Sequence, residues 1–126
     1  MGKFIINKTN AGYTFGLKAA NGEMIATGGE TYSTLDSARN GVKSVETNAP
    51  GAAVEDHTVE GYQTEKNPKF EIYSDRAGEF RFRLKASNGQ IIAVSEGYTS
   101  KANCKNGIES VKKNSVNAPV IEPEEK

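Results

Sequence analysis

Several features that often reveal a protein's function are scarce in this chain of 126 residues. It has one cysteine, Cys104, so no disulfide can form within the chain and the disulfide framework of small secreted proteins is excluded. Its 16 basic and 16 acidic side chains cancel, so no overall charge attracts it to nucleic acid or a membrane surface. No window approaches the roughly 18 apolar residues of a membrane helix, and the N-terminal residues lack the apolar core of a signal peptide. We therefore expect a cytoplasmic protein.

Motifs of catalysis are missing as well. The chain contains no glycine-rich phosphate loop, no Gly-x-Ser-x-Gly elbow and no metal-ligand spacing. His57 is the only histidine, and we interpret it as a solvent-facing strand residue, because a metal site needs several convergent ligands. Cys104 falls on an apolar helical stripe, which favours a small buried hydrophobe over a reactive thiol. We predict a protein that is not an enzyme and has no catalytic residue, cofactor or metal.

The chain does contain an internal repeat. Lys3–Ala49 aligns with Lys69–Ser115 with one-residue gaps near Gly29 and Glu79, and about 20 positions are then identical, far above chance. The stretch GLKAANGEMIATGGETYST, residues 16–34, thus reappears as RLKASNGQIIAVSEGYTSK, residues 83–101. The sequence is a tandem duplication.

Each repeat begins with alternating residues that predict antiparallel strands. In the second repeat, Phe70 and Ile72 lie on one face of residues 69–75, and residues 79–86 alternate in the same way. The pair Asn88-Gly89 then predicts a hairpin with a type I′ turn, which needs positive φ at both central residues. Residues 90–95 are the returning strand.

The hydrophobic period becomes helical in the last third of each repeat. Ser33 followed by Asp36 resembles a capping box in the first repeat, and Thr99 or Ser100 can cap the second helix. A glycine occurs at the same place on both apolar stripes, although glycine costs about 1 kcal/mol in mid-helix, which indicates a close approach of each helix to its sheet. The two stripes are Ala38, Gly41, Val42 and Val45, and Cys104, Gly107, Ile108 and Val111.

These patterns divide the chain into a first repeat at residues 1–60, a polar linker at residues 61–68 and a second repeat at residues 69–121. The two repeats are expected to share one compact domain, because a single three-stranded sheet with one helix buries little apolar surface. Residues 122–126 carry acids and a proline and are expected to form a disordered acidic tail.

The repeated motif, with its KF-I start, LKA-x-NG hairpin, E-x-Y before the helix and NG(V/I)-x-SV within it, resembles the YegP-like family of small bacterial and archaeal proteins of unknown function. The second copy is closer to that pattern, and the first departs from it at Thr14, Gly16, residues 27–29 and Leu35. The resemblance implies an α+β fold of two tandem β-β-β-α-β repeats that form a shared antiparallel sheet. One helix of each repeat would pack on it, and the last strands, Ala52–Val59 and Ala118–Ile121, would be exchanged. We expect a monomer with pseudo-two-fold symmetry, and the family brings no catalytic residues.

The residues just before the helices recur and could bind a small anionic ligand, because free N–H groups at a helix N-terminus favour anions. The structural alternative is that the carboxylates accept those N–H groups and the tyrosines cover the edge of the core. Lys101 stands where the first repeat has Leu35, so any such site would differ between the repeats. The candidate ligand-binding residues are Glu30, Tyr32, Glu96, Tyr98, Thr99, Ser100 and Lys101.

A basic ladder of Arg81, Arg83 and Lys85 projects from one predicted strand, opposite its apolar residues. Basic sheet faces can contact the phosphates of nucleic acid. The alternative is a solvated face on which Glu71 and Glu79 pair with the arginines across strands.

The sequence therefore predicts an uncharacterised cytoplasmic protein that is a non-enzymatic binding or interaction module, with a protein as a possible partner. One alternative is weak nucleic-acid association through the basic face of the second repeat. A second alternative is the small anionic-ligand site at the helix N-termini.

Overall fold

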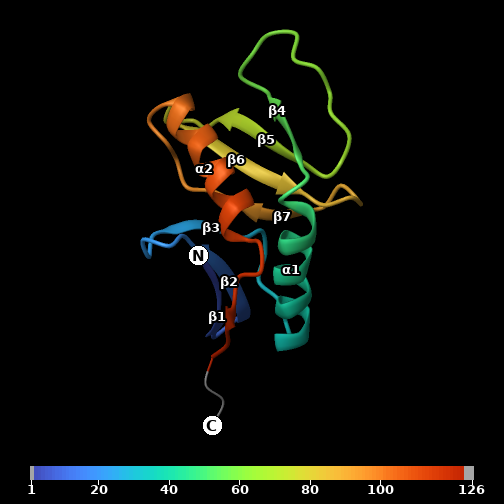
Figure 1. Cartoon of the computed structure of the whole chain (residues 1–126), viewed down its shortest axis with the longest axis vertical. Coiled ribbons are helices and arrows are strands. Elements are labelled where there is room, and N and C mark those ends of the chain that lie inside the picture. The colour runs from blue at the N-terminus through green and yellow to red at the C-terminus, as the bar shows by residue number, and fades with distance from the viewer. Residues whose placement is uncertain (1, 124–126) are drawn as a thin grey trace.

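Two β-β-β-α-β repeats follow one another in the computed structural model, which describes residues 2–123 (Figure 1). Neither helix is both long and apolar enough to cross a membrane. The first repeat comprises β1 (Lys3–Thr9), β2 (Gly12–Lys18), β3 (Met24–Gly28), α1 (Leu35–Asn48) and β4 (Ala53–Asp56), and the second comprises β5 (Lys69–Ser74), β6 (Phe80–Lys85), β7 (Ile91–Val94), α2 (Lys101–Asn114) and β8 (Val120–Ile121).

All eight strands form one sheet in the order β4-β5-β6-β7-β3-β2-β1-β8. The strand that follows each helix therefore joins the other repeat: β4 pairs with β5, and β8 pairs with β1. This confirms the predicted exchange of the last strands. The exchanged strands join in parallel, whereas the six strands from β5 to β1 are antiparallel, so the sheet is mixed at its two edges.

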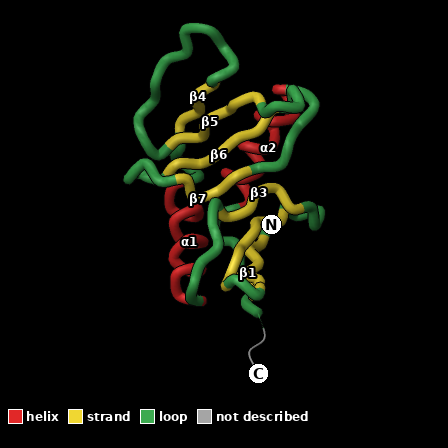
Figure 2. The backbone as a smooth tube through the Cα atoms, turned by 180° about the vertical axis from the view of Figure 1, so that it is seen from behind, coloured by secondary structure: helices red, strands yellow, loops and turns green. Residues whose placement is uncertain are grey.

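One face of the sheet is covered by both helices, and the other face is not. Figure 1 shows the helices in front of the sheet, and the reverse view in Figure 2 shows the strands in front. α1 contacts β2 of its own repeat and β7 of the other, and α2 likewise contacts β6 and β3, so both repeats build one core. The aromatic and larger aliphatic strand residues of that core include Phe4, Ile6, Phe15, Leu17, Phe70, Ile72, Phe82 and Leu84.

Each mid-helix glycine lies against an aromatic pair, as the sequence predicts. A Cβ added at Gly41 would come within 2.5 Å of the Tyr32 hydroxyl and 2.8 Å of the Phe15 ring. The corresponding atom at Gly107 would meet the hydroxyl of Tyr98 and would lie 3.1 Å from Phe82. Because real Cβ atoms do not come so close to a rigid ring, glycine lets each helix sit close to its sheet.

Two local predictions need correction. α1 is capped by Thr34, not Ser33, since the Thr34 hydroxyl accepts the Ser37 N–H at 3.1 Å. The hairpin turns are not type I′, because only the glycines of the two Asn-Gly pairs have positive φ, as at Gly89 with φ 85°. Instead, Gly89 N–H donates to the Ala86 carbonyl at 2.9 Å and the Asn88 side chain accepts the next backbone N–H. This turn is longer than a two-residue type I′ turn, and the register of the β6–β7 pair shifts next to it, between Leu84 and Lys85.

The residues expected to form a linker and a tail make specific contacts. The backbone N–H of Glu65 donates to the buried carboxylate of Glu55 at 2.7 Å, which holds the loop after β4 to the sheet. Glu122, the first residue of the expected tail, accepts two hydrogen bonds from Arg39 of α1, each 2.6 Å long. Residues 124–126 of the expected disordered tail lie outside the described residues.

Candidate functional site

The sheet face opposite the helices, here called the open face, carries the side chains that alternate with the core residues. The register of the strands places these side chains opposite one another on neighbouring strands, for example Lys3 opposite Lys18 and Glu71 opposite Arg83. Alternation places Gly16 and Thr14 on the same face, because Phe15 and Leu17 are buried beneath the helices. In the strands, this face has six basic residues, Lys3, Lys18, Lys69, Arg81, Arg83 and Lys85, and two acidic ones, Glu55 and Glu71.

In the second repeat the acids of the open face lie beneath the bases. Arg83 Nε donates to Glu71 Oε1 at 2.6 Å, and Lys85 Nζ lies 3.2 Å from Glu71 Oε2. The Glu71 side chain is only 3% exposed, whereas those of Arg83 and Lys85 are 30% and 27% exposed. The guanidinium of Arg83 also lies 4.8 Å from the centre of the Tyr73 ring. The exposed surface of this part of the open face is therefore cationic, although Arg83 and Lys85 are both paired.

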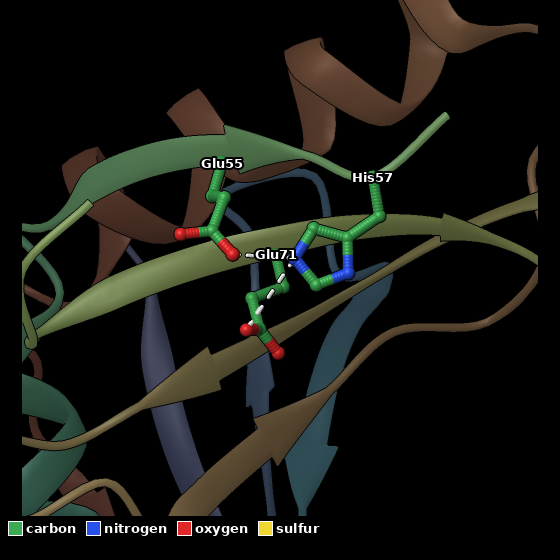
Figure 3. A group of neighbouring side chains, drawn as sticks. All are labelled: Glu55, His57 and Glu71. Carbon is green, nitrogen blue, oxygen red and sulfur yellow. Dashed lines mark hydrogen bonds and ion pairs between the residues drawn. The ribbon is translucent and has the colours of Figure 1, made fainter. Parts of the chain in front are cut away.

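The exchanged strand β4 completes this network at the edge of the sheet (Figure 3). Glu55, on β4, accepts hydrogen bonds from Lys69 Nζ at 2.7 Å and from His57 Nε2 at 2.5 Å. The same histidine nitrogen is 3.5 Å from Glu71. The ring of Tyr62, from the following loop, stacks on His57 with centroids 4.4 Å apart. His57 is thus largely covered, at 22% exposed, and the interpretation of a solvent-facing histidine is wrong.

These contacts keep the carboxylates ionised. Burial alone would raise the pKa of Glu55, but the hydrogen bonds from Lys69, the Glu65 N–H and His57 lower it to about 2. For Glu71 the cost of burial is likewise outweighed by hydrogen bonds from Arg83 and Lys85, so its pKa is lowered. The Cys104 thiol behaves in the opposite way, since burial raises its pKa to about 11, as expected for an unreactive core residue.

Glu55, His57 and Glu71 are also the residues that could hold a metal ion. Their ligand atoms lie within 4.8 Å of one another. The same carboxylates, however, already pair with Lys69, Arg83 and Lys85, so a divalent cation would enter a nearly buried site that contains three positive charges. The donor types fit a metal, but the surrounding charges do not.

The basic ladder forms ion pairs, though not all with the expected partners. Arg83 pairs with Glu71 as the sequence suggests, whereas Arg81 donates from Nε to Asp75 at 2.7 Å and not to Glu79. Both arginines make their carboxylate contacts through Nε, and Arg81 also donates from Nη1 to the Ser95 carbonyl at 3.3 Å. Lys85 completes the ladder beside Arg83.

The first repeat has a hollow where the second has this ladder. Gly16 and Thr14 occupy the positions of Arg83 and Arg81, and Asn7 occupies that of Tyr73. The hollow has a volume of about 390 Å³ and is bordered on the next strand by Met24 and Thr27. Nearby on this face the edge strand exposes Ile121, which pairs with Ile5. The open face is therefore polar and basic over the second repeat and partly apolar over the first.

Three of the five candidate ligand residues of the second repeat make structural contacts. Ser100 caps α2 by accepting the Asn103 N–H at 3.1 Å, and Lys101 pairs with Asp56 of β4 at 3.0 Å. The ring of Tyr98 stacks on Phe82, which is in the core. Thr99 and Glu96 are exposed beside them. An anion at this helix end would therefore lie near the Asp56 carboxylate.

In the first repeat, Glu30 and Tyr32 line a cleft of about 660 Å³ between α1 and the β6–β7 hairpin of the second repeat. Tyr32 stacks on Phe15, and its pKa is raised by burial and by the charge of Glu30. Asn40 and Gln90 supply amide groups from either side. Neither Glu96 nor Tyr98 lines this cleft, so the recurring Glu and Tyr positions are not brought together in it.

Sequence reasoning missed the Glu55–Lys69–Glu71 network and the hollow over Gly16. Alternation with Phe70 and Ile72 could have placed Lys69 and Glu71 together on one face. Glu55 gave no such signal, because it reaches them only through the strand exchange. The substitution of Gly16 for Arg83 between the aligned repeats was the available sign of the hollow.

Comparison with known proteins matches both repeats to a single family model. Residues 9–56 and 75–122 each match a domain of unknown function, DUF1508. The UPF0339 protein YegP of Yersinia pestis is 40% identical over 121 residues, which cover 95% of this chain and 94% of that protein. A UPF0339 protein of Treponema denticola is 63% identical over 54 residues, 43% of this chain but 93% of its own length, so it corresponds to one repeat. The solution structure of YegP from E. coli, described as a protein of unknown function, has a TM-score of 0.77 and 34% identity and covers 96% of this chain and 91% of its own.

Proposed function

We propose that this chain, which belongs to the DUF1508 family, is a non-enzymatic interaction module that binds an acidic segment of a partner protein on its open face. The observation that carries the proposal is the layering of charge over the second repeat. The buried carboxylate of Glu71 fixes Arg83 and Lys85 in place, and these cations lie above it toward solvent. A partner therefore meets an ordered array of positive charge, so less side-chain entropy is lost on binding.

The arginines have hydrogen-bonding capacity left for a partner. Arg83 uses Nε for Glu71, and Arg81 uses Nε for Asp75 and Nη1 for the Ser95 carbonyl, so the terminal N–H groups of Arg83 and those on Nη2 of Arg81 can reach a second carboxylate. Planar guanidinium groups pair with carboxylates in defined geometry, and such complementarity mainly raises association rate and specificity. Excess positive charge on this face, in a chain with no net charge, favours an acidic partner.

A binding role is also favoured by the state of the titratable groups. A general acid or base works best with a pKa near neutral pH, whereas the hydrogen bonds at Glu55 lower its pKa to about 2. The carboxylates of the network therefore act as fixed charges that position bases and not as proton carriers.

The same cations could bind the phosphates of single-stranded nucleic acid, which is the competing function. Such proteins stack bases on exposed aromatic rings. The aromatic residue of this ladder, Tyr73, already lies under the Arg83 guanidinium. The adjoining half of the open face is apolar at Met24 and Ile121, which suits a protein segment better than a phosphate backbone.

Selection of a random peptide display library on the immobilised protein tests the proposal. We expect enriched peptides to be acidic and to lose at least tenfold in affinity for the double variant Arg81→Gln, Arg83→Gln. The matched control removes two exposed helix charges, Lys43→Gln and Lys105→Gln, and should leave affinity within twofold. The proposal fails if acidic peptides are not enriched. It also fails if the protein binds labelled oligothymidylate more tightly than peptide, with an affinity that falls steeply with salt and with the arginine substitutions.

A further inference from the structure

The hollow over Gly16 lies on the same face as the basic ladder, and its place relative to Arg83 is fixed by the sheet. From this we infer, building on the proposed function, that the open face recognises an apolar side chain and an acidic side chain of one partner segment at a set spacing. The apolar side chain would enter the hollow, and the acidic one would pair with the ladder.

The hollow results from a difference between the repeats. Where the second repeat fills this part of the sheet with Arg83 stacked on Tyr73, the first has Gly16 and Asn7. The space left, about 390 Å³, is at the small end of ligand pockets and suits one large side chain.

Two apolar side chains, Phe15 and Met24, border the hollow, and the rest of its lining is polar or glycine, Glu30 included. Met24 lies over Gly16, since a Cβ added to that glycine would be 2.8 Å from the Met24 methyl carbon. The Met24 side chain is 37% exposed, and methionine's flexible thioether adapts readily to different apolar contacts. Thr27 borders the hollow from the same strand. An apolar side chain of a partner would pack against the exposed part of Met24 and remove it from water.

One row of paired residues connects the hollow to the ladder. Gly16 pairs with Thr27, Thr27 with Val94, and Val94 with Arg83. Three strand spacings of about 4.8 Å separate the ends of this row, or about 14 Å. An extended segment advances roughly 3.3 Å per residue, so about four residues cover that distance. A segment lying across the strands would thus have its acidic residue about four positions from its apolar one.

The peptide selection described above also tests this spacing. We expect enriched peptides to share a large apolar residue about four positions from an acidic residue. The variant Gly16→Arg, which reproduces the second repeat, should weaken the selected peptide at least tenfold. Changing the peptide's apolar residue to alanine should then cost nothing further in that variant. Gly51→Arg is the matched control, because it adds the same charge at a glycine with open space around it, and it should not weaken binding.

A second variant, Thr27→Arg, fills the hollow from β3 without moving Met24 and should give the same loss if Gly16→Arg perturbs folding. Acidic peptides without an apolar residue at a fixed spacing would overturn this inference and leave the proposed function standing. An apolar preference that persists in both filled variants would also overturn it, because the apolar side chain would then bind elsewhere. Failure to enrich acidic peptides would overturn the proposed function itself.

Discussion

Glu55 is a residue whose charge is retained although its side chain is only 3% exposed. Burial of a carboxylate costs several kcal/mol unless hydrogen bonds and opposite charges offset it. Lys69, His57 and the Glu65 N–H together provide three hydrogen bonds to its two oxygens. These partners come from β5 and from the loop after β4, so one side chain ties the exchanged strand to the neighbouring repeat.

We expect Glu55→Gln to lower the free energy of unfolding by about 2–4 kcal/mol at pH 7, because it leaves Lys69 buried without its main partner. Urea unfolding followed by far-ultraviolet circular dichroism measures the change. The exposed residue Glu60 lies in the same loop, and Glu60→Gln should change stability by less than about 0.5 kcal/mol. A similar small effect at Glu55 would contradict the network.

The loss of stability caused by Glu55→Gln should depend on pH. The pKa of this carboxyl is about 2 in the folded protein, below its value of 4.5 in the unfolded chain, so ionisation stabilises the fold. That contribution is complete above about pH 4.5 and disappears as the pH falls toward 2. The stability difference between wild type and Glu55→Gln should therefore shrink steadily between pH 5 and pH 2.5. A difference that stayed constant over this range would show that the carboxylate's charge contributes nothing.

Zinc should not stabilise the protein. A Zn²⁺ ion at Glu55, His57 and Glu71 would have to displace ion pairs with Lys69 and Lys85. We expect the melting temperature to change by less than about 1 °C at a tenfold excess of ZnCl₂, whereas a bound ligand far above its Kd would raise it by several degrees. A rise of several degrees that is absent in His57→Asn would establish a metal site.

At the scale of an element, one glycine in each helix determines how closely that helix packs against the sheet. We expect Gly41→Leu and Gly107→Leu each to destabilise the fold by about 3 kcal/mol or more, because the added side chain meets Tyr32 or Tyr98 and overpacks the core. Thermal unfolding should show a sharply lower melting temperature for both.

The neighbouring helix residues supply the controls. Asn40→Leu and Asn106→Leu place the same side chain on the exposed side of each helix and should cost less than about 1 kcal/mol. Because a Cβ at Gly107 meets the Tyr98 hydroxyl, Tyr98→Phe should recover part of the stability lost in Gly107→Ala. An unchanged melting curve for both leucine variants would refute the close approach.

Local sequence patterns predicted the helices and strands well where burial of apolar side chains determines the structure. The apolar period predicted both helices and the position of their glycines, and alternation predicted the strands on which Phe70 and Leu84 lie. Sequence patterns were less reliable where two local conformations differ little in free energy. Ser33 and Thr34 are both good caps, and Asn88-Gly89 closes either of two turn types. The direction of β4 beside β5 followed from the fold and from no local signal.

For the open face, sequence predicted which residues lie there but not what they do together. Alternation placed Arg81, Arg83 and Lys85 opposite the core, whereas the choice of Asp75 as the partner of Arg81 depends on the turn after β5. His57 was misread for a similar reason. The loop that covers it, through Tyr62, is brought there by the Glu65 contact with Glu55, and a single strand pattern contains no information about it.

At the scale of the whole molecule, the two repeats depend on each other. Each lends its last strand to the other, and the backbone N–H of Phe4 donates to the Pro119 carbonyl at 2.9 Å across that exchange. The direct strand contact between the repeats, β3 with β7, is short. Cohesion therefore comes from the helices that span both repeats, from the exchanged strands and from the Glu55 network.

A break in the loop between residues 60 and 61 tests this dependence. Fragments 1–60 and 61–126, when mixed, should restore the amide spectrum of the intact chain, because the break falls in an exposed loop and each half supplies the strand that the other lacks. The intact chain should be a monomer of 13.6 kDa by light scattering, and the mixture a one-to-one complex of the same mass.

Each fragment alone should give a poorly dispersed spectrum at low micromolar concentration, because the edge of its sheet and much of its core would be uncovered. A fragment that pairs with a second copy of itself would also cover its sheet edge and core, and light scattering would detect the doubled mass. A well-dispersed spectrum from a monomeric fragment would show that one repeat folds alone. The strand exchange would then join two independent units and would not be a condition of their folding.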